Sequence, residues 1–255
     1  MRIIVKVGTS TLTHATGHLD IRRVGVLCEV LSDLKNAGHE IVLVSSGAIG
    51  MGVGKLNLRE KPSDMPTKQA AAAVGQCELM YVYDKLFSEY SHTVAQILLT
   101  GEDLRDEARR TNFSNTLSRL LSLDVLPILN ENDTIATDEI AVGDNDTLGA
   151  TVATCADADL LIILTDIDGL YTADPRKSAS ATLISEVREI TPEMAESAGG
   201  SGTALSTGGM ATKLAAARIC MDAGIDMMIV NGSNPAVLYD ALDGKPVGTR
   251  FIGRK

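Results

Sequence analysis

Short apolar segments recur along the chain, and each is bounded by glycine, proline or polar residues. The first, Arg-Ile-Ile-Val-Lys-Val at 2–7, is rich in β-branched residues and ends at Gly8, which predicts a buried strand. Similar segments follow at 41–44, 94–99, 125–129, 160–164, within 183–190, and at 227–230 and 249–252. Most are apolar at successive positions, which is typical of strands that are covered on both faces of a parallel sheet.

Between these segments, apolar residues at spacings of three and four predict helices. Asp20 can cap a helix whose apolar positions run from Ile21 to Leu34, and Gly38 marks its end. Further helices are expected at about 66–90, 105–123, 147–158, from 192 onward, 210–224 and 235–243. The alternation predicts an α/β fold, a three-layer αβα sandwich around a mostly parallel sheet of about eight strands. We expect a single domain over residues 1–255, with one lobe at roughly 1–165 and a second at 166–255.

Composition narrows the class of protein. The chain has 255 residues, 45% of them apolar, and a net charge of −10. Such an acidic balance argues against a nucleic-acid partner, because binding to a phosphate backbone needs clustered Lys and Arg. No apolar run approaches the ~18 residues that cross a bilayer, and no leader segment opens the chain. We therefore expect a soluble, cytoplasmic protein with no membrane partner.

The cysteines support the same location. Cys28, Cys77, Cys155 and Cys220 lie far apart in predicted helices, and no Cys-x-x-Cys pair occurs. This spacing suggests neither a zinc site nor a redox motif, so we expect reduced, buried side chains.

The densest acidic region lies at 130–150, directly after an apolar segment. It contains Asn-Glu-Asn-Asp at 130–133 and Gly-Asp-Asn-Asp at 143–146, without any Lys or Arg. Crowded carboxylates at a strand end repel one another unless a positive group joins them. That positive group would be a divalent metal carried by a nucleotide, an ammonium group of a substrate, or a lysine from elsewhere in the chain. A solvated acidic loop is the alternative, and the repeated Asn-Asp pair favours a binding segment.

Lys6 lies inside the first predicted strand, just before Gly8-Thr9-Ser10. A buried lysine is costly unless it faces a charge. Lys6 is therefore either an edge residue that points to water or a fixed cation aimed at phosphate, beside the N–H groups that Gly8 exposes.

Two further glycine-rich stretches follow. Gly47 to Gly54 forms a predicted loop that matches neither a Walker A motif nor a dinucleotide fingerprint. Ser46 with the N–H groups of Gly47 and Ala48 can still hold a carboxylate or phosphate at a helix start. In the second stretch, Ser206 to Lys213, the lysine lies about one helical turn after Gly209, where it is either a surface residue or an anion ligand.

Five loops follow predicted strands, and the carboxyl ends of parallel strands meet at one edge of a sheet. These loops are Gly8–Ser10, Ser45–Gly47, Asn130–Asp133, Thr165–Asp166 and Asn231–Ser233. Two lysines, several carboxylates and three glycine-rich turns at one edge suit phosphoryl transfer, which needs positioning and cations more than covalent participation. Lys6 and Lys213 would neutralise phosphate charge, and Asp146 would hold both lysines. The histidines form no triad or metal-ligand pattern, so hydrolase chemistry has no support.

Several motifs at these strand ends are specific in combination. They are Val5–Ser10, Ser45–Ile49, Asn130–Asp133, Val142–Asp146, Leu164–Asp166, Gly169–Arg176 and Thr207–Lys213. Together they resemble the glutamate 5-kinases, a family of the amino acid kinase superfamily, over essentially the whole chain. The resemblance implies the amino acid kinase fold and transfer of the ATP γ-phosphoryl group to the γ-carboxylate of L-glutamate. The product would be L-glutamyl 5-phosphate, in the first step of L-proline biosynthesis.

The resemblance also implies roles for individual residues. Lys6, Asp146 and Lys213 would be catalytic, and Ser46, Asp133 and Asn145 would bind glutamate. The ATP-binding residues would be Lys6, Thr165, Asp166, Thr207, Gly208, Gly209, Met210, Ala211, Thr212 and Lys213. Mg²⁺ would come with ATP, without protein metal ligands or a permanently bound cofactor. The lobe at 1–165 would bind glutamate and carry out phosphoryl transfer, and the lobe at 166–255 would bind the nucleotide.

The family implies homo-oligomers, dimers or tetramers, and feedback inhibition by L-proline. Many members carry a C-terminal PUA domain, which we expect this chain to lack. The alternatives are another kinase of the superfamily, such as an acetylglutamate or aspartate kinase, or a non-catalytic amino-acid-sensing module. Acetylglutamate and aspartate kinases usually show a doubled glycine after the first lysine, whereas Val7 and Gly8 follow Lys6 here. Intact Lys6, Asp146 and Lys213 argue against a sensor.

Overall fold

The computed structural model describes residues 1–14, 18–58, 60, 62–136, 145–175, 178, 180–197 and 209–254. Its strands form one sheet in the order β3-β4-β2-β1-β5-β7-β8-β6. They are β1 (Arg2–Val7), β2 (Glu40–Ser45), β3 (Val94–Leu99), β4 (Leu126–Glu131), β5 (Leu160–Thr165), β6 (Glu186–Val187), β7 (Asp226–Asn231) and β8 (Thr249–Phe251). All neighbours are parallel except β7 and β8, which confirms the predicted sheet.

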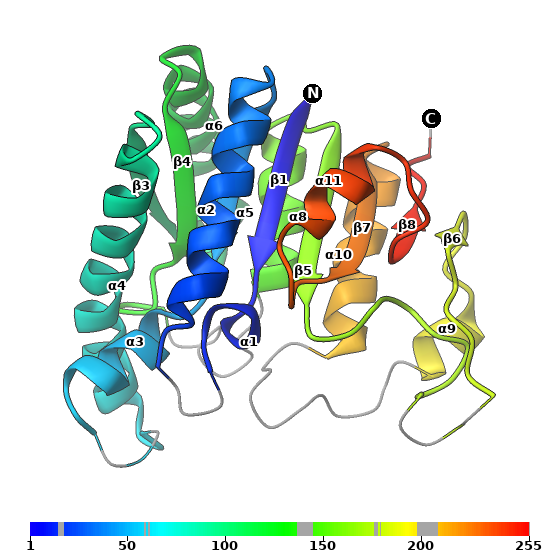
Figure 1. Ribbon diagram of the computed structural model, residues 1–255, viewed down its shortest axis with the longest axis horizontal. Coiled ribbons are helices and arrows are strands. Elements are labelled where there is room, and N and C mark those ends of the chain that lie inside the picture. The colour runs from blue at the N-terminus through cyan, green and yellow to red at the C-terminus, as the bar shows by residue number, and fades with distance from the viewer. Residues whose placement is uncertain are drawn as a thin grey trace.

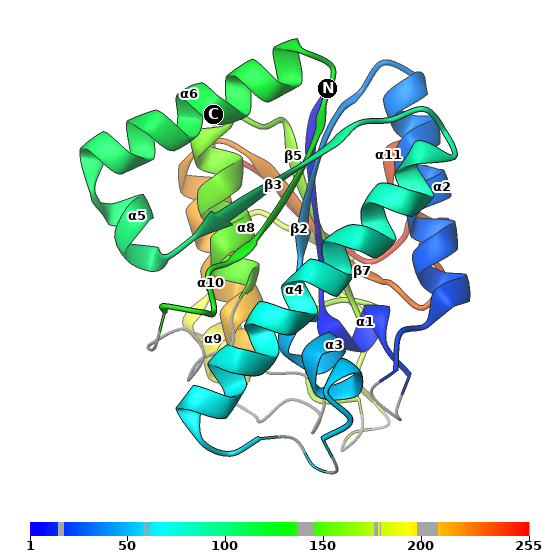
Figure 2. The ribbon, with the colours of Figure 1, turned by 90° about the vertical axis from the view of Figure 1, so that its left-hand side faces the viewer.

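Helices cover both faces of this sheet. They are α1 (Thr9–Leu12), α2 (Ile21–Asn36), α3 (Ala48–Lys55), α4 (Met65–Ser88), α5 (Gly101–Arg105), α6 (Glu107–Ser122), α8 (Asn145–Cys155), α9 (Pro192–Ser197), α10 (Met210–Asp222) and α11 (Val237–Leu242). Figure 2 shows α2, α4 and α11 on one side of the sheet and α5, α6, α8 and α10 on the other. The three-layer αβα sandwich is therefore confirmed. The division into two lobes at residue 165 stays a prediction.

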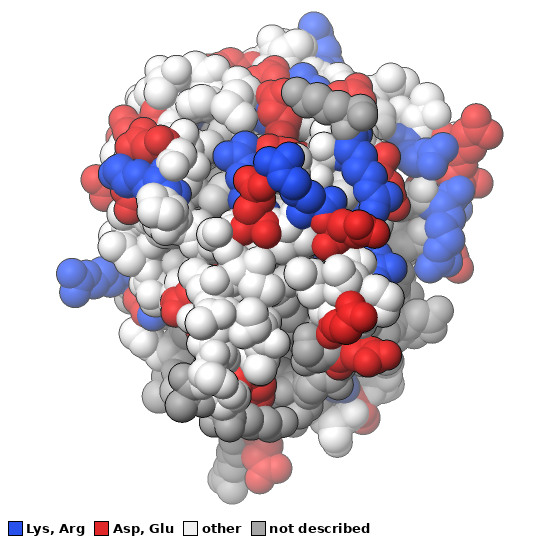
Figure 3. Space-filling model, turned by 90° about the vertical axis from the view of Figure 1, so that its right-hand side faces the viewer, with Lys and Arg blue, Asp and Glu red and all other residues white. Residues whose placement is uncertain are grey.

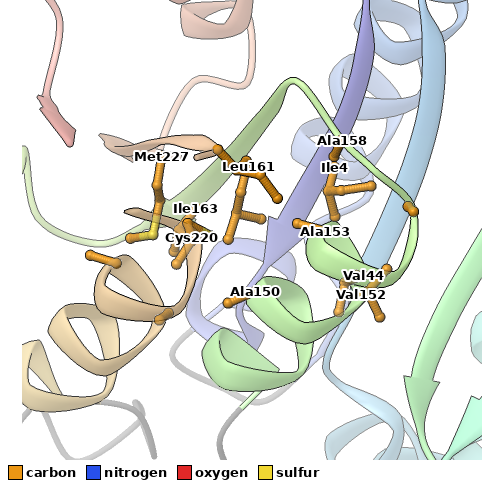
Figure 4. Close-up of a cluster of buried hydrophobic side chains, with 14 of the residues drawn as sticks. Ile4, Val44, Ala150, Val152, Ala153, Ala158, Leu161, Ile163, Cys220 and Met227 are labelled. Carbon is orange, nitrogen blue, oxygen red and sulfur yellow. The ribbon is translucent and has the colours of Figure 1, made fainter. Parts of the chain in front are cut away.

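Each face of the sheet has its own apolar core. In Figure 4, the small side chains Ala150 and Ala153 let α8 lie against Ile4 of β1, and Cys220 of α10 lies beside Ile163 of β5. Aliphatic residues of this kind gain stability from the apolar area that they remove from water. The central strands are consequently buried on both faces, as their unbroken apolar sequences predict.

The carboxyl ends of β1, β2, β4, β5 and β7 lie at the same edge of the sheet, at the bottom of Figure 1. The loops that were expected to converge therefore do so. Two helix starts near this edge have clear local causes. Asp20 accepts a hydrogen bond from the backbone of Arg23 at 3.0 Å and caps α2, and Asp64 accepts one from Thr67 at 2.9 Å and caps α4.

The helix predicted at 105–123 is present as α6, Glu107–Ser122, and a short separate helix, α5, precedes it at Gly101–Arg105. Asp106 has extended backbone angles (φ −73°, ψ 122°) and accepts a hydrogen bond from the backbone of Arg109. A capping aspartate satisfies N–H groups at a helix start and so begins a new helix. The chain therefore ends α5 at Arg105 and starts α6 at Glu107.

The loop predicted at 47–54 is wrong, because residues 48–55 form helix α3. Its glycines permit a close approach to α4. A Cβ atom at Gly52 would lie 1.8 Å from the carbonyl oxygen of Ala71, and one at Gly75 would lie 1.8 Å from that of Ala48. The two helices thus touch backbone to backbone, and the glycines serve packing more than flexibility.

Gly52→Ala is expected to lower the free energy of unfolding by about 3 kcal/mol, because the added methyl group must push α3 away from α4. The melting temperature should fall by roughly 5–10 °C in thermal denaturation followed by circular dichroism. Gly54→Ala in the same helix is the control, since its Cβ would meet nothing closer than a His18 nitrogen at 3.8 Å. Equal melting temperatures for the two variants would contradict the close crossing.

The cysteines lie in helices α2, α4, α8 and α10, as expected. Cys28 and Cys220 are buried, and burial raises the pKa of the Cys220 thiol to about 12. The prediction that all four are buried is wrong, because Cys77 is exposed on the outer side of α4.

The surface beside β6 and β8 carries intermingled acidic and basic side chains (Figure 3). Arg250 pairs with Asp226 at 2.7 Å, and Arg254 pairs with Asp222 at 2.7 Å. The Arg250–Asp226 pair is partly buried, whereas the Arg254–Asp222 pair is exposed and contributes little to stability. Among the helices that the structure describes, none combines the length and apolar character needed to span a membrane.

Candidate active site

Three charged side chains from three elements meet beside the carboxyl end of β1. The Nζ atom of Lys6 lies 2.5 Å from Oδ1 of Asp146, and the Nζ atom of Lys213 lies 3.1 Å from Oδ2. Lys6 comes from β1, Asp146 from the first turn of α8, and Lys213 from the first turn of α10. The structure thus brings together the three residues that the sequence predicts to be catalytic.

These side chains are almost fully buried. Lys6 is 7% exposed, Lys213 is 4% exposed and Asp146 is 0% exposed. Lys6 therefore does not point to water from a sheet edge; it lies on a central strand, and Gly149 of α8 packs on its aliphatic stem. Two ammonium groups and one carboxylate sum to one positive charge, which favours an anion at this place.

The aspartate is held in its charged form. Burial raises the pKa of the Asp146 carboxyl, but the charges and hydrogen bonds of Lys6 and Lys213 outweigh this effect and lower the pKa from 3.8 to about 2. Thr212 also contacts it, with Oγ1 at 3.0 Å from Asp146 Oδ2 and 2.8 Å from the carbonyl oxygen of Gly209. Because Asp146 is ionised at neutral pH, it acts as a fixed acceptor that orients both lysines.

A chain of amide groups leads away from this centre. Asn145 Nδ2 donates to Ser46 Oγ at 2.8 Å and to Asn130 Oδ1 at 3.0 Å. Asn130 Nδ2 in turn donates to Gln76 Oε1 of α4 at 2.9 Å. Two of the three predicted glutamate ligands, Ser46 and Asn145, are therefore in direct contact.

The third predicted glutamate ligand, Asp133, lies at the far end of this amide chain. It lines a small, partly open pocket together with Gln76, and the pocket also contains Ala48, Ala72, Leu98, Glu131, Asn132 and Thr134. Gln76 thus connects the pocket to Asn130 and, through it, to Asn145 and Ser46. The lining therefore combines acidic residues with residues that carry amide and hydroxyl groups.

The predicted nucleotide residues lie on the other side of Lys6. Thr165 ends β5 and Asp166 follows it. β5 pairs with β1 so that Lys6 lies opposite Ile163. Thr165 Oγ1 donates to Asp166 Oδ1 at 3.2 Å. Gly209 caps α10, whose first residues are Met210, Ala211, Thr212 and Lys213. Thr207 and Gly208 lie outside the described residues.

Two polar residues of the site were not among the predicted ligands. The sequence presents Asn130 only as part of the motif at 130–133, and no motif contains Gln76. Gln76 is 8% exposed and lies on the buried face of α4, four residues after Ala72. A glutamine on the apolar stripe of a helix is the signal that could have indicated it, because buried amides need polar partners.

The described residues contain no group of three or more His, Cys, Asp or Glu side chains that could hold a metal ion. The acidic residues at 138, 139 and 144 lie outside the described part of the chain. What the described site offers to a ligand is therefore chiefly cationic and amide chemistry.

Comparison with known proteins gives the family. The model of the amino acid kinase family matches residues 1–231. The chain is 53% identical to glutamate 5-kinase from Clostridium perfringens (strain 13 / Type A), over 100% of this chain and 96% of that protein. It is 55% identical to glutamate 5-kinase from Clostridium tetani (strain Massachusetts / E88), over 98% of this chain and 93% of that protein.

Among solved structures, the chain resembles carbamate kinase from Giardia lamblia bound to AMP-PNP. The TM-score is 0.72 at 19% sequence identity, over 99% of this chain and 98% of the other. This likeness shows the fold. The family model and the relatives that share half of its residues establish that the chain belongs to the amino acid kinase family and, within it, to the glutamate 5-kinases.

Proposed function

We propose that the chain catalyses transfer of the γ-phosphoryl group of ATP to the γ-carboxylate of L-glutamate. The products are L-glutamyl 5-phosphate and ADP, and the reaction is the first step of L-proline biosynthesis. The observation that carries this proposal is the buried group of Lys6, Asp146 and Lys213, with Asp146 within 2.5 Å and 3.1 Å of the two ammonium groups.

The chemistry of the acceptor suits this arrangement. A carboxylate oxygen attacks the γ-phosphorus while the bond from that phosphorus to the β–γ bridging oxygen breaks, and ADP leaves. The acceptor is already an anion, so no base must remove a proton. The difficulty is the repulsion between the carboxylate and the phosphates. Two buried ammonium groups reduce this repulsion and stabilise charge on the moving phosphoryl group.

Ser46, Asn145 and Asp133 would bind glutamate. The hydroxyl of Ser46 suits a carboxylate of the substrate, because it can donate a hydrogen bond. Asn145 Nδ2, which donates to Ser46 Oγ at 2.8 Å and to Asn130 Oδ1 at 3.0 Å, would hold that hydroxyl in place. Asp133, in the pocket beyond Gln76, suits the α-ammonium group. This arrangement would place the γ-carboxylate toward Lys6.

ATP would bind along the other side of Lys6. Thr165, Asp166 and the segment from Thr207 to Lys213 would hold the nucleotide, with the start of α10 directed at its phosphates. Lys213 lies in that first helical turn, so a phosphate at the helix start would be within reach of a buried cation. Mg²⁺ would be held mainly by the phosphate oxygens of ATP and would neutralise part of their charge.

The remaining expectations belong to the same proposal. The enzyme would act in the cytoplasm as a homo-oligomer, a dimer or tetramer, without nucleic-acid or membrane partners. L-Proline, the end product of the pathway, would inhibit it.

Purified protein with ATP, Mg²⁺ and L-glutamate should form an acyl phosphate that hydroxylamine traps as a hydroxamate, with one ADP for each hydroxamate. The same assay with L-aspartate or N-acetyl-L-glutamate should give rates at least about 100-fold lower. The side chain of aspartate is too short to bring its carboxylate to the γ-phosphoryl group, and N-acetyl-L-glutamate has no ammonium group to pair with Asp133. Faster turnover of either compound would overturn the substrate assignment. Binding of glutamate or proline without any phosphorylation would instead favour the amino-acid-sensing module.

A further inference from the structure

Tyr83 of α4 has a polar group that the proposed mechanism does not use. Its side chain is 0% exposed and packs beside Phe87, with ring centroids 6.2 Å apart. Its hydroxyl lies 2.8 Å from Oγ of Ser45, the last residue of β2. A phenylalanine would fill the same space without a buried hydroxyl, and burial of a hydroxyl is costly unless it forms a hydrogen bond.

The protons of this group can be assigned by counting donors. Ser45 Oγ also lies 3.0 Å from the carbonyl oxygen of Ser46, which can only accept. Because a serine hydroxyl has one proton, Ser45 must donate to that carbonyl and accept from Tyr83. The reverse assignment would leave the buried Tyr83 proton without an acceptor. The hydrogen bonds therefore run from Tyr83 to Ser45 and from Ser45 to the Ser46 carbonyl.

This chain of hydrogen bonds fixes the peptide group that joins Ser46 to Gly47. In a planar trans peptide the C=O and the following N–H point in opposite directions. With the carbonyl of Ser46 turned toward Ser45 and Tyr83, the N–H of Gly47 must point away from them. Gly47 has φ +106°, a conformation that favours glycine, and caps α3.

Ser46 is held from both faces of the sheet. Its backbone N–H donates to the carbonyl of Val7 at 3.1 Å, and its hydroxyl oxygen accepts from Asn145 of α8 at 2.8 Å. Tyr83 acts from the opposite side, because α4 and α8 cover opposite faces (Figure 2). Among the described residues, the Ser46 hydroxyl proton has no acceptor, so that proton is available to a ligand.

We infer that Tyr83 is a positioning residue for the acceptor substrate. Through Ser45 it orients the Ser46 hydroxyl and the Gly47 N–H, so that both can donate to one carboxylate. The inference rests on the proposed function only in identifying that carboxylate as one of L-glutamate. Tyr83 itself would touch no substrate.

Tyr83→Phe should raise KM for L-glutamate about tenfold, which is the effect expected when one orienting hydrogen bond is lost. KM for ATP should stay unchanged and the melting temperature should stay close to that of the wild type. Tyr81→Phe is the matched control, because Tyr81 lies in the same helix with 63% exposure. Its kinetic constants should equal those of the wild type.

A double-mutant cycle with Ser45→Ala tests the route of the effect. If Tyr83 acts through Ser45, the double variant should have the same KM for glutamate as Ser45→Ala alone. An unchanged glutamate KM in Tyr83→Phe would overturn the inference. So would a parallel rise in both KM values with a lowered melting temperature, because that pattern reports a general loss of packing.

If the wild type used a different carboxylate acceptor, the proposed function would fall, and the same variants assayed on that acceptor would still test Tyr83.

Discussion

Lys213→Met should lower kcat by about 10³-fold, the scale of loss seen when a fixed group that stabilises transition-state charge is removed. Lys213 is 4% exposed, so no water can replace its ammonium group efficiently. Methionine keeps most of the side-chain volume and removes the ammonium group with its charge and hydrogen-bond donors. KM for L-glutamate should change little, because in the proposed mechanism Lys213 contacts the nucleotide and Ser46, Asn145 and Asp133 bind glutamate. Steady-state kinetics by hydroxamate and ADP formation would measure both constants.

The same variant should fold. Asp146 would keep Lys6 at 2.5 Å, so the substitution leaves one ammonium group with one carboxylate and no uncompensated negative charge. We expect a change in unfolding free energy of about 1 kcal/mol, less than the loss usual for breaking a buried pair. Lys245→Met, at an exposed ion pair with Asp240, is the control and should leave kcat unchanged. A variant with more than a tenth of wild-type kcat would contradict a catalytic role for Lys213.

Much of this site could be predicted because two simple rules act together. Short apolar segments such as 160–164 are typical of buried strands, and parallel strands place their carboxyl ends at one edge. Lys6 and Asp146 are 140 residues apart in sequence, yet each flanks such an end. A lysine in an apolar strand and a carboxylate at the start of a helix both need partners of opposite charge, so their pairing follows from the cost of burial.

Other features depend on contacts that no local pattern contains. The glycines of α3 resemble those of a loop until Gly52 is seen against the Ala71 carbonyl. Gln76 is a polar residue on the apolar face of α4, which indicates a buried polar contact without naming its partner, and Tyr83 looks like an ordinary core residue. Their hydrogen bonds to Asn130 and Ser45 arise only where α4 crosses the ends of β4 and β2. Side chains that act through a second residue cannot be recognised from spacing alone.

Asp146→Asn should be inactive and also less stable, in contrast to Lys213→Met. The substitution removes the carboxylate from between two ammonium groups that are each under 10% exposed, and the net charge of the three side chains rises from +1 to +2. Loss of one partner from a buried charge pair costs about 3–5 kcal/mol. We expect kcat to fall by at least about 10³-fold, because neither lysine would be held in place. Urea denaturation would measure the lost free energy.

Two further measurements would assign this loss to charge. An anion that binds between the lysines should stabilise the variant more than the wild type, so ATP or inorganic phosphate should raise its melting temperature by a larger amount.

Acid should lower the free energy of unfolding of the wild type, because it protonates Asp146. The Asp146 pKa is about 2 in the folded protein against 3.8 ordinarily, so its stabilising contribution is complete above pH 4 and is lost as the pH falls toward 2. A protonated Asp146 is as neutral as asparagine, so the difference in unfolding free energy between the two proteins should shrink over this range. A difference that stayed constant from pH 5 to pH 2 would show that the aspartate stabilises the fold by its shape alone, without holding the two lysines by charge.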